Sequence, residues 1–542
     1  MDDIVSIGLD NKKFNNFNYM MFAVNQTFTY ANNSLFYSQI NPTYYDYYNR
    51  VVKLNLEWYD GYVQGIHNNY NGILSTRIGS SIVNGIVNNV FSRNLVYDRA
   101  DAKGDYKAID FFSNWANENN LIDNLKLLSK FSGASGGSVL KLNISYNKVW
   151  VQPLRQDQFI YETDAQGNIS AITCYMKPYE NLFGKNDNYF VVEKRYFTKD
   201  VEIPTSVFLL DGTNKIYKKK ATSKKAVVEY QVLHYHGQIL NNGMASSVKM
   251  NSLKWYDIPS GVREMIKKDF NAFYFDKPEL LPFGNSLGCF MLQLNGKDPT
   301  ITTGNFGQSF LTDIRSELVE YELINAYAMR DMYNAQGQVG VPKAMTMNDA
   351  LENPYNAPKG NYEYFPGDPE KQKPIITQFE LRADEWIKKK DDCLKKMATI
   401  LGMSPKVIAS YLNVAGNDYF GKTATESKYD ESNDEIFLND KRKTIINFIN
   451  PVINCILKYY GYYQEIKARF LENKSSPSGQ DLRDIIEKYN CGFIDLRAAL
   501  RDLNPLLTEK ELDEVERKAK IRQEEIKASQ TLNINSFGDY GE

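Results

Sequence analysis

The spacing of apolar residues divides the chain into helical and β-rich stretches. Residues 1–130 carry apolar side chains mainly at helical spacing, as between Phe111 and Phe131, and predict helices. The glycines of FSGASGGSVLKLNI (131–144) end the last of these helices and lead into a strand. Residues 140–255 consist of short β-branched and aromatic runs separated by turn signals such as DAQGN and LDGTN. They predict an antiparallel β layer, so the expected fold class is α+β.

Two long helices with a small insertion between them are predicted next. The first spans 309–334, and these residues share one of its faces: Ile314, Leu318, Tyr321, Ala328 and Met332. Residues 335–381 lose this period and are rich in proline and glycine, which predicts a loop-rich or short-stranded insertion. The second helix spans 382–403, and its apolar stripe consists of Trp386, Cys393, Leu394, Met397, Ile400 and Leu401.

A loop and a third long helix follow this pair. Gly402 ends the second helix and Pro405 starts a short one, so that 404–422 is predicted to be mostly loop. The next stretch, 423–465, is polar at first and then apolar, and it predicts a long helix that Pro451 kinks.

The last stretch, 466–542, is polar. A capping box formed by Thr508 and Glu511 predicts that a charged helix starts there. Few of its positions are apolar, so this tail is expected to be solvated or to pack within an assembly.

Composition narrows the function classes. The chain has 542 residues, enough for two to four sub-structures, and 64 basic against 66 acidic residues give a net charge of −2. A protein that grips nucleic acid through phosphates usually carries a basic excess, so the balance argues against tight DNA binding. It is compatible with a conduit through which DNA slides.

The cysteines and the apolar runs indicate the compartment. Five cysteines lie far apart without a CxxC motif, which argues against a disulfide framework or a zinc module and favours a reducing compartment. Neither a signal peptide nor an apolar run of membrane-spanning length is recognised, so no membrane partner is expected and the chain is expected to be soluble and intracellular when made.

One motif favours an enzyme. The segment GNDYFGKT (416–423) fits the phosphate-binding loop pattern of nucleotide hydrolases. In such a loop Gly416 and Gly421 would permit the tight turn, Lys422 would reach the β- and γ-phosphates, and Thr423 would bind Mg²⁺. The context differs, because the preceding SPKVIASYL has a helix-start pattern where a buried strand is needed, and the following stretch is polar. A flexible loop is the preferred interpretation, and the nucleotide hydrolase is kept as the alternative.

Other chemical signals have ordinary explanations. The glycines of FSGASGGS (131–138) are read as a helix stop rather than an anion cradle. His234 and His236 share one face of a predicted strand, but no third metal ligand is evident, and His67 is the only other histidine. No catalytic pair, metal site or cofactor is predicted, and the chain is not expected to be an enzyme.

Lysines gather in two places. Five lie in the second long helix: Lys388, Lys389, Lys390, Lys395 and Lys396. One interpretation is a solvated outer face together with Asp391 and Asp392. The other depends on the family resemblance described below, which implies that some of these lysines face a DNA channel, and the two interpretations stay open. The other group is interpreted as a charged turn of a hairpin: Lys218, Lys219, Lys220, Lys224 and Lys225.

Four segments, in this order, resemble the portal proteins of tailed phages that infect Gram-positive hosts. They are LIDNLKLLSKFSGASGGSVLKLNI (121–144), LPFGNS (281–286), GKTATES (421–427) and YNCGFIDLRAALRDLNPLLTEKELDEVERKAKIRQEE (489–525). The chain departs from the family pattern at Asp495, where a serine is common, and in a longer segment around Gly304 and Gly307.

The resemblance implies a structural subunit of a ring, usually a dodecamer, around a channel. The implied parts are a wing (1–308), stem helices (309–334 and 382–403), a clip (335–381), a tunnel-loop region (404–422), a kinked helix (423–465) and a crown with the C-terminal tail (466–542). The implied tunnel-loop residues are Asn413, Val414, Ala415, Gly416, Asn417, Asp418, Tyr419 and Phe420.

The same resemblance implies partners and location. Double-stranded viral DNA would pass the channel during packaging and ejection. The clip would dock the terminase large subunit and later the head–tail adaptors, and the wing would contact scaffold and major capsid protein. The subunit would be made in the host cytoplasm and end in the virion, at a capsid vertex. Another capsid or adaptor protein remains a further alternative.

Overall fold

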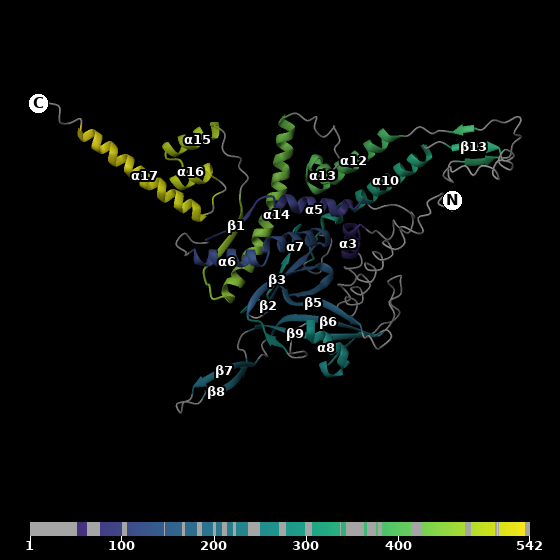
Figure 1. Ribbon diagram of the computed structural model, residues 1–542, viewed down its shortest axis with the longest axis horizontal. Helices are drawn as coiled ribbons and strands as arrows, with labels where there is room; N and C mark the ends of the chain where they lie inside the picture. Colours follow the sequence, from purple (N-terminus) through teal and green to yellow (C-terminus); the bar gives the residue numbers. More distant parts are fainter. Residues whose placement is uncertain are drawn as a thin grey trace, which may run out of the picture.

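The computed structural model combines helices and strands, which confirms the α+β class. A central body carries three projections: the helix pair α10/α12, the helices α15–α17, and the hairpin β7–β8 (Figure 1). The structure describes residues 51–61, 76–99, 106–145, 147–164, 169–180, 187–198, 202–208, 214–220, 224–236, 250–269, 278–298, 306–335, 338–342, 362–365, 375–377, 382–412, 424–471, 479–504, 507 and 509–536.

The first described elements surround a buried helix. They are α3 (Lys53–Asp60), α5 (Ile78–Val90), β1 (Leu95–Arg99), α6 (Lys107–Glu118) and α7 (Leu121–Ser135). Apolar residues recur along α5 at spacings of three, four and one, and they are fully or almost fully buried. Gly79 permits the close approach of α3, because a Cβ atom there would lie 2.7 Å from the carbonyl oxygen of Trp58.

Two sheets make up the β layer. The smaller has the order β12-β2-β3 and contains β2 (Ser138–Ser145), β3 (Lys148–Arg155) and β12 (Cys289–Leu292). The larger has the order β10-β9-β6-β5-β4, with β11 beside β9, and contains β4 (Phe159–Thr163), β5 (Ile169–Glu180), β6 (Asp187–Thr198), β9 (Lys225–His236), β10 (Met250–Leu253) and β11 (Glu279–Leu280). All these pairings are antiparallel, as predicted.

Shorter elements complete this half of the chain. They are the hairpin β7 (Glu202–Phe208) and β8 (Asn214–Lys220), the helix α8 (Ser260–Asp269), and the 3-10 helices η2 (Gln156–Gln158) and η3 (Trp255–Asp257). Of the second lysine group, Lys218, Lys219 and Lys220 lie in strand β8 and Lys225 begins β9, so these lysines belong to strands and not to the charged turn that the sequence predicted.

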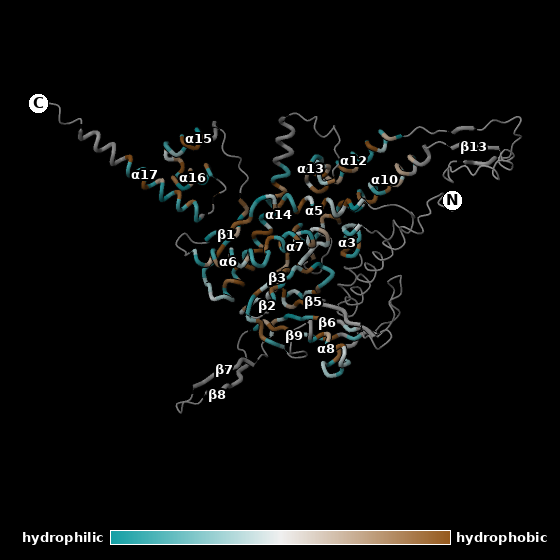
Figure 2. The backbone as a smooth tube through the Cα atoms, viewed as in Figure 1, coloured by the Kyte–Doolittle hydropathy of each residue, from teal (hydrophilic) through white to brown (hydrophobic). Residues whose placement is uncertain are grey.

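The C-terminal half is mainly helical. Its helices are α9 (Phe310–Asp313), α10 (Arg315–Ala335), α12 (Ala383–Leu401), α13 (Pro405–Tyr411), α14 (Ala424–Tyr459), α15 (Gly479–Asn490), α16 (Leu496–Leu503) and α17 (Glu509–Ser536). Its strands are β13 (Gln338–Pro342), β14 (Tyr362–Phe365), β15 (Ile375–Thr377) and β16 (Ile466–Phe470). One apolar core joins α5, α7, both sheets and α14, and a smaller cluster lies between α8 and the strands β6 and β9. By contrast, α17 is mostly hydrophilic over its coloured part (Figure 2).

The two long helices of the middle region are confirmed, with one correction. The second is α12, and β13, β14 and β15 form the short-stranded insertion, in the order β14-β13-β15. The first is not continuous over 309–334, because the backbone of Ile314 leaves helical geometry between α9 and α10. Ser309 caps α9 by accepting a hydrogen bond from the backbone N–H of Leu311. Of the five apolar residues predicted to share one face of this helix, Met332 is 55% exposed, whereas the other four are buried: Ile314, Leu318, Tyr321 and Ala328.

A strand pair corrects the predicted ends of the chain. The region 1–130 contains β1 and the tail from 466 begins with β16, and these two strands pair antiparallel from Leu95↔Phe470 to Arg99↔Ile466. The tail therefore starts as part of the central body. Pro451 lies inside α14, as predicted. Thr508 of the capping box lies outside the described residues, and no described helix has both the length and the apolar character of a membrane span.

Candidate functional site

The helix pair α10/α12 contains all five candidate lysines of the second long helix. The two helices pack through a seam of buried side chains that includes Leu318 and Tyr321 from α10 and Leu394 and Met397 from α12. Cys393 Sγ donates a hydrogen bond to the carbonyl oxygen of Glu317, 3.1 Å away. Burial raises the pKa of this thiol to about 12, so it is a packing residue rather than a nucleophile.

An aromatic contact fixes the outer end of the pair. The Trp386 ring stacks on Tyr327 with centroids 6.3 Å apart, and its Nε1 donates to Asp331 Oδ2 at 2.7 Å. Arg382 also donates to Asp331 Oδ2, at 2.9 Å, and Lys389 Nζ lies 4.9 Å from the centre of the Trp386 ring. The sequence placed Trp386 in the apolar stripe, but the role of Asp331 as its partner carried no local signal.

The exposed lysines form two edges of α12. Lys388 and Lys395 lie seven residues apart and share one edge, while Lys389 and Lys396 share the other. All four are exposed. Lys395 pairs with Asp392 at 3.7 Å, within α12, and Lys396 pairs with Glu320 of α10 at 3.3 Å.

The fifth lysine differs from the other four. Lys390 is half-buried, and desolvation lowers its pKa. The same helix also contains four carboxylates: Asp384, Glu385, Asp391 and Asp392. With five lysines and four carboxylates, α12 carries a net charge of +1. Its surface therefore mixes positive and negative side chains and is not a strongly basic stripe.

The turn from α12 to α13 is tightly held. Gly402 ends α12 in the left-handed conformation (φ 70°), and Ser404 precedes Pro405 at the first helical position. The buried carboxylate of Asp434, from α14, accepts hydrogen bonds from Ser404 N at 2.7 Å and Ser404 Oγ at 2.6 Å. A pocket of about 530 Å³ opens beside this turn, with Phe437 in its wall.

The helices before and after the candidate loop, α13 and α14, both contact α5. Tyr411, at the end of α13, accepts a 2.7 Å hydrogen bond from Asn89 Nδ2, and its ring fills the space that a side chain at Gly85 would occupy. On the other side, Arg442 of α14 donates to the carbonyl oxygens of Asn89 at 2.9 Å and Val90 at 3.1 Å. The candidate tunnel-loop residues 413–420 lie outside the described residues.

The described elements on either side of the nucleotide-binding motif are helices. The motif 416–423 also lies outside the described residues, but the described element before it is the helix α13 and the one after it is α14. A phosphate-binding loop requires a buried strand before the helix. No group of three or more His, Cys, Asp or Glu residues in the described part of the chain could hold a metal ion. His234 of β9 stacks on Tyr189, with ring centroids 4.8 Å apart.

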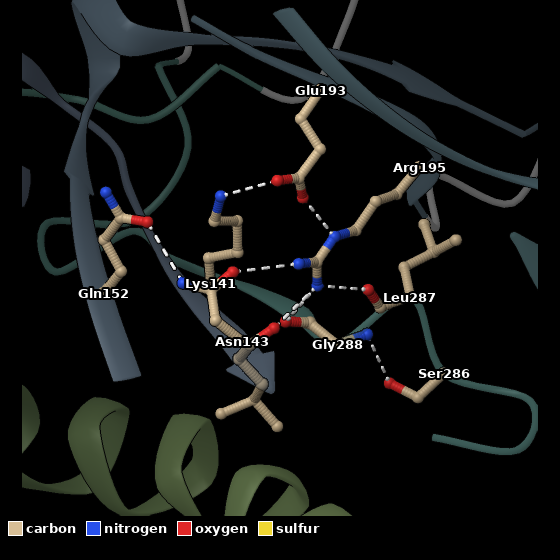
Figure 3. A network of polar contacts seen from close by, with 9 residues as sticks. Lys141, Asn143, Gln152, Glu193, Arg195, Ser286, Leu287 and Gly288 are labelled. Atoms are coloured by element: carbon tan, nitrogen blue, oxygen red, sulfur yellow. Dashed lines mark hydrogen bonds and ion pairs between the residues drawn. The ribbon is translucent and has the colours of Figure 1, made fainter. Parts of the chain in front are cut away.

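A buried charge cluster was not foreseen from the sequence. Glu193 on β6 accepts hydrogen bonds from Lys141 Nζ at 2.9 Å and Arg195 Nε at 2.6 Å, and all three side chains are almost completely buried (Figure 3). Burial by itself would raise the pKa of Glu193, but Arg195 and Lys141 outweigh it and lower the pKa to about 2. The only sequence signal was alternation: Glu193 and Arg195 share the inward face of a strand.

Arg195 also links the two sheets. Its Nη1 donates to the carbonyl oxygens of Leu142 at 2.9 Å and Leu287 at 3.0 Å, and its Nη2 donates to Asn143 Oδ1 at 3.1 Å (Figure 3). These bonds connect β6 of the larger sheet to β2 of the smaller sheet and to the turn before β12. The cluster is therefore a structural fastener of the body.

Comparisons with known proteins found similarity among solved structures. No protein-family model matches the sequence, and no curated protein matches it. The chain is similar to a solved chain described as the neck of an empty GTA particle computed with C6 symmetry. The identity is 11%, the TM-score is 0.39, and the similarity covers 82% of this chain and 93% of the other. That score is too low to establish a shared fold or function.

Proposed function

We propose that the chain is a phage portal subunit, which assembles with its copies into a ring around a channel for double-stranded DNA. The observation that carries this proposal is the projecting helix pair. Two helices of 21 and 19 residues pack side by side, meet a small sheet at their outer end, and are followed by a short helix, a connecting segment and the 36-residue α14. This is the order of stem, clip, tunnel loop and long helix that the sequence resemblance implies.

Apolar side chains on the pair support assembly. Tyr327, Met329 and Met332 of α10 and Ile387 and Ile400 of α12 are all more than 40% exposed. On a projecting arm these side chains are available for contact with another molecule. A ring of identical head-to-tail contacts would cover each arm with the next copy.

The charge pattern suits passage rather than capture. The near-neutral chain and the mixed surface of α12 would attract phosphates only transiently, and strong phosphate binding would stall moving DNA. In this proposal 335–381 is the clip that docks the terminase large subunit and head–tail adaptors. The body is the wing that meets scaffold and major capsid protein, and the subunit resides at a capsid vertex after its synthesis in the host cytoplasm.

Ring formation is the direct test. The purified chain, examined by negative-stain electron microscopy and mass photometry, is expected to form rings with a central hole and a mass near twelve subunits. If only monomers form, the measurement is repeated with the scaffold protein co-expressed. Monomers under both conditions, or compact particles without a hole, contradict the proposal. ATP hydrolysis that Lys422→Ala abolishes would favour the nucleotide hydrolase instead.

Charge reversal on α12 tests whether its lysines face the channel. The double variant K388E/K395E changes one edge of the helix and K389E/K396E changes the other. We expect one of the two to lower the packaging rate, because DNA passes one edge more closely, and the loss is expected to shrink as salt is raised. Packaging is measured as nuclease-protected DNA.

Both double variants are matched in charge. They remove the surface ion pairs of Lys395 and Lys396 and the cation–π contact of Lys389 with Trp386, and exposed contacts of these kinds contribute about 1 kcal/mol or less to folding. Thermal unfolding of each variant checks this. Equal packaging by both variants and the wild type would assign these lysines to a solvated outer face.

A further inference from the structure

A cavity opens beside the junction of the two sheets. Its volume is about 630 Å³, and it is bounded by β4, β5, β6, the segment around β12, and α14. Its walls include Tyr161, Phe197, Ser286, Cys289, Phe448 and Pro451. The proposed ring function assigns no role to this space.

Two thiols meet at the cavity. Cys289 of β12 lies in its wall and is 8% exposed, whereas Cys174 of β5 lies behind it and is completely buried. Cys289 is the cross-strand partner of Lys141, and Cys174 is the cross-strand partner of Glu193, so both thiols lie beside the 2.9 Å ion pair between Lys141 and Glu193. The two cysteines belong to different sheets, so their side chains bridge the same junction that Arg195 fastens.

The groups around the pair make its two members unequal. Burial by itself would raise the pKa of Cys289, but the hydrogen bond from Cys174 and the charge of Arg195 outweigh it and lower the pKa, with a further contribution from Lys141 and an opposing one from Glu193. The hydrogen bond that it donates, together with burial, raises the pKa of Cys174.

Two more groups border this cluster. Tyr230 of β9 is hydrogen bonded to Glu193, and Cys455 of α14 is hydrogen bonded to Ser286. Burial raises the pKa of Cys455 to about 11. Cys289 therefore combines a place in the cavity wall with a lowered pKa, and thiolates are the reactive form of cysteine.

We propose that Cys289 and Cys174 form an oxidant-sensitive thiol pair, in which Cys289 reacts with a peroxide that enters from the cavity and Cys174 converts the product into a disulfide. The thiolate sulfur of Cys289 attacks one peroxide oxygen, so that an S–O bond forms, the O–O bond breaks, and the leaving hydroxide takes up the thiol proton as water. Cys174 then attacks the sulfenic sulfur, an S–S bond forms, and the S–O bond breaks with release of a second water. Two thiols are oxidised and one hydrogen peroxide is reduced to two waters.

The disulfide would join β5 to β12 and so lock the two sheets together. The pair would stay reduced in a reducing cytoplasm and close after exposure to an oxidising medium. This inference is independent of the proposed ring function, because it concerns residues inside one subunit.

Thiol counting after oxidation tests the pair. The full chain is used with Cys491→Ser, because Cys491 is exposed and would react on its own. After treatment with hydrogen peroxide, the protein is denatured in excess iodoacetamide, and the intact mass and the unreduced peptide map are recorded. Of the four remaining cysteines (five minus one), only Cys393 and Cys455 are expected to be alkylated. Cys174 and Cys289 are expected in one cross-linked peptide.

Variants separate the two roles. With Cys174→Ala added, Cys289 is expected to remain a sulfenic acid that dimedone, a 1,3-diketone, traps; with Cys289→Ala, neither disulfide nor adduct is expected at Cys174. Circular dichroism checks that each variant folds. If a variant does not fold, the number of alkylated cysteines in the Cys491→Ser chain still tests whether the disulfide forms. Four alkylated cysteines after peroxide, or a disulfide between Cys289 and Cys455, would overturn the proposal.

Discussion

Replacing Glu193 by glutamine is expected to lower the free energy of unfolding by about 3–5 kcal/mol, the usual effect of removing one partner from a buried ion pair. The variant keeps the shape of the side chain but removes the negative charge between Lys141 and Arg195. Both cations would then stay buried without the carboxylate that neutralises them. The hydrogen bonds of Arg195 between the two sheets would then be kept only at the free-energy cost of a buried, unpaired charge. Urea denaturation followed by circular dichroism measures the change.

The same variant gives a pH signature. The folded pKa of Glu193 is about 2, below its ordinary value of 4.5, so the carboxylate contributes stability that is fully present above pH 4.5 and is lost as pH falls towards 2. The contribution is on the order of 3 kcal/mol. The difference in unfolding free energy between wild type and E193Q is therefore expected to shrink across this window.

A surface glutamate provides the control. Glu264 forms an exposed pair with Lys267 at 3.1 Å, so Glu264→Gln is expected to change stability by less than about 0.5 kcal/mol with little dependence on pH. An E193Q variant as stable as E264Q would show that the buried cluster does not fasten the sheets.

Deleting residues 413–420 is expected to abolish DNA packaging while leaving ring assembly intact. In the proposed function this loop reaches towards DNA, and its removal takes away the contact that retains DNA in the channel. Electron microscopy of the rings and nuclease protection of packaged DNA measure the two effects separately.

The described flanks explain why the fold should tolerate the deletion. Tyr411 before the loop is held by Asn89, and Arg442 beyond it is held by the carbonyl oxygens at the end of α5. Asp434 holds the turn at Ser404 from α14. None of these bonds involves 413–420, so the change in stability is expected to stay within about 0.5 kcal/mol.

A replacement of equal length separates chemistry from reach. A chain with eight glycine and serine residues at 413–420 keeps the connection between α13 and α14 but loses Tyr419 and Phe420. If this chain packages DNA, the length of the loop is what packaging requires. If it does not package DNA, the side chains of the loop are required. Failure of either variant to form rings would contradict the placement of the tunnel loop.

The elements that depend on local pattern were determined by the sequence itself. The stripe from Cys393 to Leu401 defines α12, Pro405 starts α13, and the turn signals between apolar runs define the antiparallel layer, because each pattern acts within a few residues. The proline-rich insertion between the long helices was likewise recognised from composition. The assignment of 413–420 to a tunnel loop stays a prediction.

Only the tertiary structure decided the contacts between distant segments. The strand β16 alternates buried residues at Ile466, Ala468 and Phe470, but it becomes a strand by pairing with β1, far away in the sequence. Glu193 resembled any polar strand residue until folding placed Lys141 beside it, and Cys174 and Cys289 meet only because two sheets pack together. Such contacts depend on which distant surfaces become neighbours, and the period of a sequence specifies the faces of an element but not the partner that each face meets.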